Sequence, residues 1–332
     1  MRERISSCPS LLAIPMILFH THGMEGIYLG GDGGGSTCRI GAWDRHGTLM
    51  THATGSSSNA YVVGFDEAVR TVRFLIEDIR SRLEGRPILS FCFGNSGLAR
   101  AEERTRWEAA LKEILGNEVP LLLVTDIHLL LAMNDPRRLG LCLVSGTGSV
   151  ALGRNEHGSE VRSGGMGSAL GDEGSGWWIA REAIGRTLRS VEKRDLPTRM
   201  GKELLAFFKL PDYSQAISFF NSSERTKSEI ARFTLIVAQA AEQGDLLALS
   251  IIEEAARELG LLVSSVQKRL EEPYPKRLII SGGTIVHNPL LHELLLKHLD
   301  ERLEIHLAVE GGLEGARILA QQLITHGSAS YE

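Results

Sequence analysis

The sequence predicts an α/β protein of about two domains. Its 332 residues are enough for two separate hydrophobic cores. Short apolar runs typical of buried strands alternate with longer segments in which apolar residues recur at helical spacing. A strand, a glycine-rich turn and a second strand are expected near residue 34 and again near residue 147. We therefore expect the chain to use the same opening unit twice.

Charge and cysteine usage favour a small-molecule substrate inside the cell. The net charge of −5 provides no basic surface for nucleic acid. The four cysteines lie far apart without a Cys-x-x-Cys pair, which favours reduced core residues in a cytoplasmic protein. A metal or iron–sulfur role is the alternative for Cys8, Cys38, Cys92 and Cys142.

Residues 1–23 are expected to be a leader outside the folded protein. Their apolar run, 11–19, weakly resembles a signal peptide, but Pro15 interrupts it and it is too short to span a bilayer. A second plausible start, Met24, precedes the first predicted strand. No other segment has the roughly 18 continuous apolar residues of a membrane helix. We expect a dispensable extension or an upstream start codon, and no membrane partner.

The glycine-rich stretch 30–37 is a candidate phosphate-binding turn. It lies between two short runs that are typical of strands. Consecutive backbone N–H groups in such a turn can bind an anion. It lacks the Lys-Ser/Thr end of a P-loop and no helical pattern follows it, so neither a P-loop nor a dinucleotide turn is indicated. The predicted phosphate ligands are Gly33, Gly34, Gly35, Ser36 and Thr37.

A carboxylate within this turn indicates a cation. Asp32 would repel a phosphate unless a hydrated Mg²⁺ lay between them, held partly by the carboxylate and partly by nucleotide oxygens. The alternative is a tight hairpin with a solvated Asp32.

Two further glycine turns suggest the rest of a nucleotide site. Residues 145–149 connect predicted strands at 141–144 and 150–153, and two such hairpins facing each other would clamp a phosphate chain. A strand at 277–280 runs into 281–284, where exposed backbone could lie against adenine or ribose, although a plain turn is the alternative. The candidate residues are Gly146, Thr147, Gly148, Ser149, Gly282 and Gly283.

The predicted strand 119–124 ends at Thr125 and Asp126. Ligands in α/β sheets gather beyond the carboxyl ends of strands. A carboxylate there could accept the proton of a substrate hydroxyl that attacks a γ-phosphate. The alternative is that Asp126 caps a short helix at 127–133.

Polar and glycine-rich loops supply candidate sugar contacts. The run 164–176 contains six glycines and two adjacent acids, which favours a loop facing a substrate over simple capping of the helix that follows. The loop 55–59 ends in Asn59, whose amide could bond sugar hydroxyls, although such loops are usually solvated turns. The candidate substrate contacts are Asn59, Ser96, Asp126, Gly165 and Asp172.

The remaining segments predict the surrounding elements. Helical spacing predicts helices over 65–84 and 101–115, a purely helical region over 197–272, and helices near 289–300 and over 313–325. Apolar runs predict further strands over 48–54, 87–93 and 303–308.

Together and in this order, these elements resemble the sugar kinase/Hsp70/actin superfamily, and within it the group containing N-acetylglucosamine kinase, glucosamine kinase and the BadF/BadG-type ATPases. The likeness is strongest in 164–176, where this chain has Met166 in place of the usual Trp. It implies two ribonuclease-H-like (actin-like ATPase) domains hinged around a nucleotide cleft. The expected boundaries are a leader at 1–23, domains at 24–136 and 137–312, and a final helix at 313–332 that returns to the first domain.

The resemblance also implies roles. The turns at 31–37 and 145–149 would bind the phosphates of ATP with Mg²⁺, and 281–284 would bind adenosine. Asp126 matches the position of a catalytic base, and Asn59 and Asp172 match positions that hold sugar hydroxyls. The implied reaction is ATP-dependent phosphorylation of an amino sugar, most simply N-acetylglucosamine or glucosamine. Several members of the group are homodimers.

Two other functions are considered. An ATPase activator of a radical dehydratase or reductase would need cysteines that hold an iron–sulfur cluster at a dimer interface, whereas Cys38, Cys92 and Cys142 lie in predicted buried strands. A non-catalytic sugar sensor in a transcription regulator would need a helix-turn-helix, which 23 leader residues cannot encode.

Overall fold

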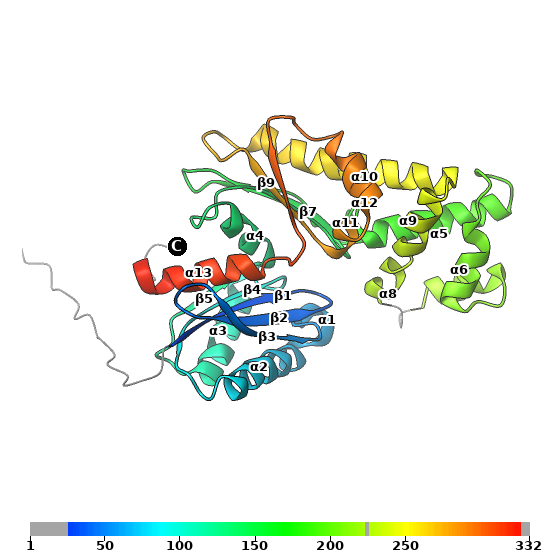
Figure 1. Ribbon diagram of the computed structural model, residues 1–332. Helices are drawn as coiled ribbons and strands as arrows, with labels where there is room; N and C mark the ends of the chain where they lie inside the picture. The colour runs from blue at the N-terminus through cyan, green and yellow to red at the C-terminus, as the bar shows by residue number, and fades with distance from the viewer. Residues whose placement is uncertain (1–25, 223–225, 327–332) are drawn as a thin grey trace, which may run out of the picture.

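Two five-stranded sheets form the framework of the protein, in a computed structural model that describes residues 26–222 and 226–326. The first sheet contains β1 (Ile27–Gly33), β2 (Cys38–Trp43), β3 (Leu49–Gly55), β4 (Ile88–Asn95) and β5 (Leu121–Val124). The second sheet contains β6 (Gly140–Ser145), β7 (Ser149–Arg154), β8 (Glu160–Gly164), β9 (Arg277–Ser281) and β10 (Glu304–Ala308). The sheets lie in two lobes (Figure 1), and the predicted α/β class is confirmed.

Both sheets have the same topology. The strand order is β3-β2-β1-β4-β5 in the first sheet and, read from the hairpin end, β8-β7-β6-β9-β10 in the second. In each, the first three strands pair antiparallel and the last two join the first strand in parallel. The carboxyl ends of parallel neighbours meet at one edge of a sheet. Each lobe therefore gathers three strand ends at a single edge, with one of the predicted glycine turns in the first lobe and two in the second.

An amphipathic helix packs against the sheet of the first lobe. Its helices are α1 (Ala60–Val63), α2 (Phe65–Arg82) and α3 (Ala101–Leu115), which confirms the helices predicted over 65–84 and 101–115. Val72, Ile76 and Ile79 recur at helical spacing on α2 and are fully buried with the residues of β1 and β2. The ring of Trp107 on α3 lies 5.2 Å from that of Phe93, so aromatic packing fixes the outer helix on β4.

Two helices lie between the sheets, α4 (Asp126–Asn134) and α13 (Leu313–His326). Leu129 of α4 packs with Ala316 of α13 in one cluster, while Leu131 packs with Ile279 of the second sheet in another. The two helices approach so closely that a Cβ on Gly315 would lie 1.9 Å from the carbonyl oxygen of Leu129. α13 thus packs against the first lobe although it follows the second sheet in sequence (Figure 1).

The second lobe carries the helical region. Its elements are α5 (Gly176–Val191), α6 (Met200–Phe208), the 3-10 helix η1 (Tyr213–Gln215), α7 (Ala216–Phe220), α8 (Lys227–Ala231), α9 (Thr234–Glu242), α10 (Leu246–Arg269), α11 (Gly283–Val286) and α12 (Pro289–Leu296). Within the described part of 197–272 the prediction of helices without strands is confirmed. The helix expected near 289–300 ends earlier, at Leu296, and the short α11 was not predicted.

The cysteines of the described residues lie in the interior of the lobes. Cys38, Cys92 and Cys142 are buried and free, as expected for reduced core residues. Burial raises the pKa of the Cys38 thiol to about 12, so it stays protonated at neutral pH. Cys8 and the leader at 1–23 lie outside the described residues. Within 26–222 and 226–326, no helix combines the length and the apolar character needed to cross a membrane.

Candidate active site

The first glycine turn is a tight connection between β1 and β2. The N–H of Gly34 donates to the carbonyl of Thr37 at 2.8 Å, and Ser36 at its tip is exposed. Two neighbouring loops support it. The hydroxyl of Ser57 donates to the carbonyl oxygen of Gly34 at 3.1 Å, and the N–H of Ser96 donates to the carbonyl oxygen of Gly33 at 3.0 Å. The turn is thus held from both sides at the carboxyl edge of the first sheet.

Asp32 lies in β1, one residue before the turn residues, and is not a solvated hairpin residue. Its side chain is 14% exposed, and its Oδ2 accepts from Arg39 at 2.9 Å and from the backbone N–H of Gly312 at 3.0 Å. Burial raises the pKa of this carboxyl, and Arg39 and Gly312 counteract the effect. Both contacts use Oδ2, and Oδ1 takes part in neither of them.

The second and third glycine turns are joined at one carbonyl. The carbonyl oxygen of Gly146 accepts from the N–H of Gly176 and from the hydroxyl of Thr284, both at 2.8 Å. Gly282 has φ +109°, and a Cβ there would lie 2.4 Å from the carbonyl oxygen of Ser145. Only glycine permits this close approach of the two turns. The turn at 281–284 is therefore part of the same assembly as the turn at 145–149.

Asp126 is the first residue of α4, and Thr125 occupies the N-cap position, so the capping alternative is wrong. The carboxylate accepts the N–H of Ile127 at 2.9 Å. Loss of solvent and, after it, the charge of Asp32 raise the pKa of Asp126 to about 7, against the opposing effects of the Ile127 N–H and of Arg162. A carboxyl with a pKa near 7 can accept a proton at neutral pH.

Asn59 and Ser96 come together beside the first turn. The Asn59 amide donates to the Ser96 hydroxyl at 3.0 Å, while its oxygen caps α1 by accepting the N–H of Tyr61. Ser96 follows β4 and Asp126 follows β5, and these strands are parallel neighbours. Three predicted sugar contacts therefore lie at one edge of the first sheet.

Asp172 lies at the second glycine turn. It adopts φ +65°, a conformation that is unusual outside glycine, and its Oδ1 is 3.4 Å from the N–H of Ser149. Burial raises the pKa of its carboxyl. Within the described residues no hydrogen bond joins Asp172 to Asn59 or Ser96. The structure thus places this acid next to a predicted phosphate turn, and Gly165 directly follows β8.

Sequence reasoning missed two polar groups near these acids. Arg162 on β8 donates to the carbonyl of Gly165 at 2.9 Å, and its charge lowers the pKa of both Asp126 and Asp172. His128, on the first turn of α4, bonds Glu160 at 3.0 Å. A single basic residue within a strand or helix carries no sequence pattern, so nothing in the sequence distinguished either one.

The described residues contain no cluster of three or more His, Cys, Asp or Glu side chains able to hold a metal ion. Asp32, the predicted Mg²⁺ ligand, lies in β1 beside the first predicted phosphate turn.

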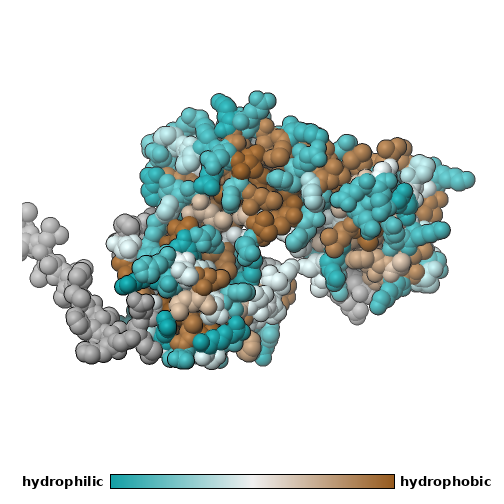
Figure 2. Space-filling model, viewed as in Figure 1, coloured by the Kyte–Doolittle hydropathy of each residue, from teal (hydrophilic) through white to brown (hydrophobic). Residues whose placement is uncertain are grey.

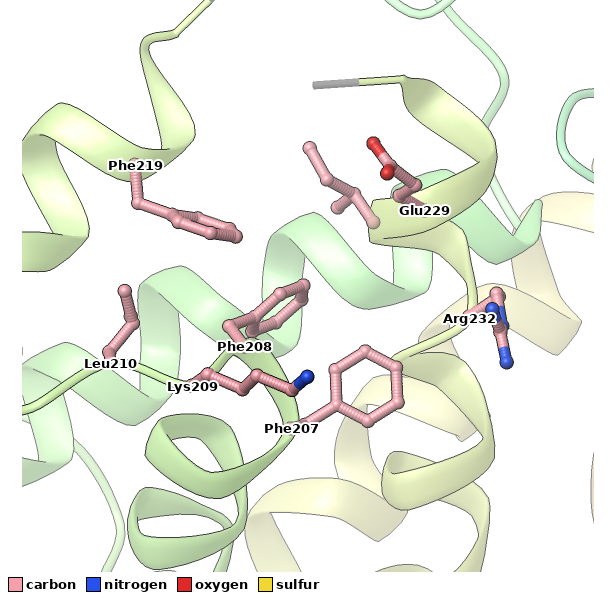
Figure 3. Close-up of a pocket in the computed structure, with 8 residues that line it drawn as sticks. Phe207, Phe208, Lys209, Leu210, Phe219, Glu229 and Arg232 are labelled. Carbon is pink, nitrogen blue, oxygen red and sulfur yellow. The ribbon is translucent and has the colours of Figure 1, made fainter. Parts of the chain in front are cut away.

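An apolar hollow lies elsewhere. A cavity of about 730 Å³ in the helical region contains the rings of Phe207, Phe208 and Phe219 (Figure 3), and no predicted site residue lines it. Figure 2 shows a notch between the first lobe and the helical part of the second. Across it, the hydroxyls of Ser36 and Ser228 lie 3.2 Å apart.

Known proteins resemble this chain over most of its length. An N-acetylmuramic acid/N-acetylglucosamine kinase of Clostridium acetobutylicum is 33% identical over 263 residues, which cover 78% of this chain and 85% of the relative. An N-acetyl-D-glucosamine kinase of Dictyostelium discoideum is 28% identical over 290 residues, covering 83% and 90%.

Solved structures share the fold. A Chromobacterium violaceum protein superposes with a TM-score of 0.70 at 23% identity, covering 89% of this chain and 99% of that protein. A ROK family glucokinase from Streptomyces griseus gives 0.57 at 17% identity, covering 90% and 99%. These likenesses confirm two ribonuclease-H-like sheets of the actin-like ATPase type. The model of the BadF/BadG/BcrA/BcrD ATPase family matches residues 29–317. The chain therefore belongs to the BadF/BadG/BcrA/BcrD ATPase family.

Proposed function

We propose that the protein is an ATP-dependent kinase that transfers a phosphoryl group to a hydroxyl of an amino sugar. The observation that carries this proposal is the position of Asp126 at the same strand edge as the first glycine turn and the Asn59–Ser96 pair. Both curated relatives are named N-acetylglucosamine kinases, which supports an amino sugar as the acceptor.

ATP would bind between the lobes. Backbone N–H groups of 33–37 and 146–149 would donate to its phosphates, and the backbone of Gly282 and Gly283 would face adenosine. Asp32 would hold a hydrated Mg²⁺, which when bound neutralises phosphate charge. The hydrogen bond from Thr284 to Gly146 supports this arrangement, because it links the adenosine turn to a phosphate turn.

The acceptor sugar would lie against the first lobe. Asn59 and Ser96 would bind its hydroxyls, and Asp126 would orient the attacking hydroxyl and accept its proton. Asp172 and Gly165 would approach from the second lobe when the cleft closes, which would exclude water that otherwise hydrolyses ATP. We assign 24–136 and 137–312 to the two moving domains and 313–332 to the first of them.

The activator alternative gains no support from the structure. It needs accessible cysteines that can hold a cluster between two subunits. Cys38, Cys92 and Cys142 are instead buried within their own sheets.

A sugar screen tests the proposal. ADP release would be followed with ATP and Mg²⁺ in the presence of glucosamine, N-acetylglucosamine, N-acetylmannosamine, N-acetylmuramic acid or glucose. We expect at least one amino sugar to stimulate ADP release well above the rate without sugar and above glucose. Stimulation by none of the amino sugars would contradict the proposal.

A further inference from the structure

The short helix α8 of the second lobe reaches the first glycine turn. The hydroxyl of Ser228 lies 3.2 Å from that of Ser36, although 192 residues separate them in sequence. Figure 1 shows α8 on the side of the helical region that faces the first lobe, whereas α6 lies at its far end. α8 therefore borders the cleft at the tip of a predicted phosphate turn.

Lys227 is the first residue of α8 and adjoins this contact. The hydroxyl of Thr226 and the carboxylate of Glu229 form a capping box, so the helix start is fixed without Lys227. A cation in the first turn of a helix opposes the helix dipole, so the lysine does not stabilise α8. Its side chain is exposed, and within the described residues it forms no ion pair.

The charge of Lys227 also acts on the second glycine turn. Burial raises the pKa of the Asp172 carboxyl, and the N–H of Ser149 and the positive charge of Lys227 lower it. Asp172 lies 3.4 Å from that same N–H of Ser149. The charge of Lys227 thus acts on an acid beside the second predicted phosphate turn, and the next residue, Ser228, contacts the tip of the first.

We propose that Lys227 binds the terminal phosphates of ATP and stabilises the charge that develops during transfer. This inference rests on the proposed kinase function. The other cations beside these acids are already engaged: Arg39 bonds Asp32, and Arg162 donates to the carbonyls of Gly164 and Gly165. An ammonium group offers three donors as a compact charge, which suits phosphate oxygens.

Isothermal titration of the full chain with ATP, ADP and AMP tests this role. We expect Lys227→Met to weaken ATP binding by about 10- to 100-fold, the range expected for a hydrogen bond between charged groups. AMP, which lacks the terminal phosphates, should bind within about twofold of wild type. Lys227→Arg should recover most of the loss. The matched control is Lys202→Met, on α6, because Lys202 is also an exposed lysine of the helical region.

The outcomes are distinct. Wild-type affinity for ATP together with wild-type kcat in Lys227→Met would overturn this inference and leave the kinase proposal intact. Equal weakening of ATP and AMP would show a structural effect, and equal weakening by Lys202→Met would show a general charge effect; either result overturns it. Lys227→Gln gives the same test if Lys227→Met does not fold. A wild-type protein that binds no ATP would overturn both proposals.

Discussion

Replacing Asp126 by asparagine should reduce activity and increase stability at the same time. The substitution removes the proposed base, while the asparagine oxygen can still accept the N–H of Ile127. General bases typically contribute 100- to 10,000-fold to a rate. We expect kcat of Asp126→Asn to fall by about that factor, with the KM for ATP within about twofold of wild type.

The effect on stability follows from the burial that raises the pKa of Asp126. Burial, and then Asp32, raise the pKa of Asp126 from 3.8 to about 7. The folded state then binds a proton more tightly than the unfolded state, so stability falls as the pH rises from about 4 to about 7. At about 1.4 kcal/mol per pKa unit, the ionised carboxylate destabilises the fold by at most about 4 kcal/mol at pH 8. Neutral asparagine should recover much of this.

Urea unfolding and ADP release measure the two effects. The free energy of unfolding should be larger for Asp126→Asn than for wild type at pH 8, and the two should be nearly equal at pH 4. The kcat/KM of wild type should fall about tenfold per pH unit below pH 7. Asp135→Asn, at the other end of α4, is the control; the pKa of Asp135 is lowered by Arg137, so this variant should keep its activity and gain no stability. A kcat within threefold of wild type, or lower stability at pH 8, would refute the reasoning for Asp126.

Three further changes test other parts of the site. Asp32→Asn should raise the Mg²⁺ concentration for half-maximal activity by about tenfold or more; an unchanged Mg²⁺ titration would remove Asp32 from the metal site. Gly282→Ala forces a Cβ to within 2.4 Å of the Ser145 carbonyl and should weaken ATP binding strongly in a titration, whereas Gly244→Ala, with φ +82° and open space, should cost only about 1 kcal/mol of stability. Asn59→Ala should raise the KM for the sugar by about tenfold without changing that for ATP; the reverse pattern in steady-state kinetics would place Asn59 at the nucleotide.

The spacing of apolar residues predicted the longer helices and the buried strands, and it missed an element too short to show such spacing. The apolar spacing over 65–84 identified α2, which buries one face against the first sheet. The apolar run 87–93 identified β4, which is buried within that sheet. The four-residue α11 is too short to show a period. The common strand order of the two sheets has no matching sequence repeat, because the same topology accepts many apolar side chains.

Candidate site residues could be predicted where a chemically suitable residue type stands at the end of a predicted strand. Glycine turns at strand ends are visible in sequence, and so is Asp126 directly after a strand. The partner of Asp172 was not, because the contact with Ser149 joins residues 23 apart through a left-handed backbone. Lys227 could not be identified either, since its neighbour Ser228 meets Ser36 only when the two lobes come together, and the sequence does not show that its charge acts on Asp172.

A structure with the non-hydrolysable analogue AMP-PNP, Mg²⁺ and N-acetylglucosamine tests the central claim most directly. The account predicts the phosphates between the turns at 33–37 and 146–149, with a sugar hydroxyl within hydrogen-bonding distance of Asp126. A nucleotide bound away from these two turns would contradict it.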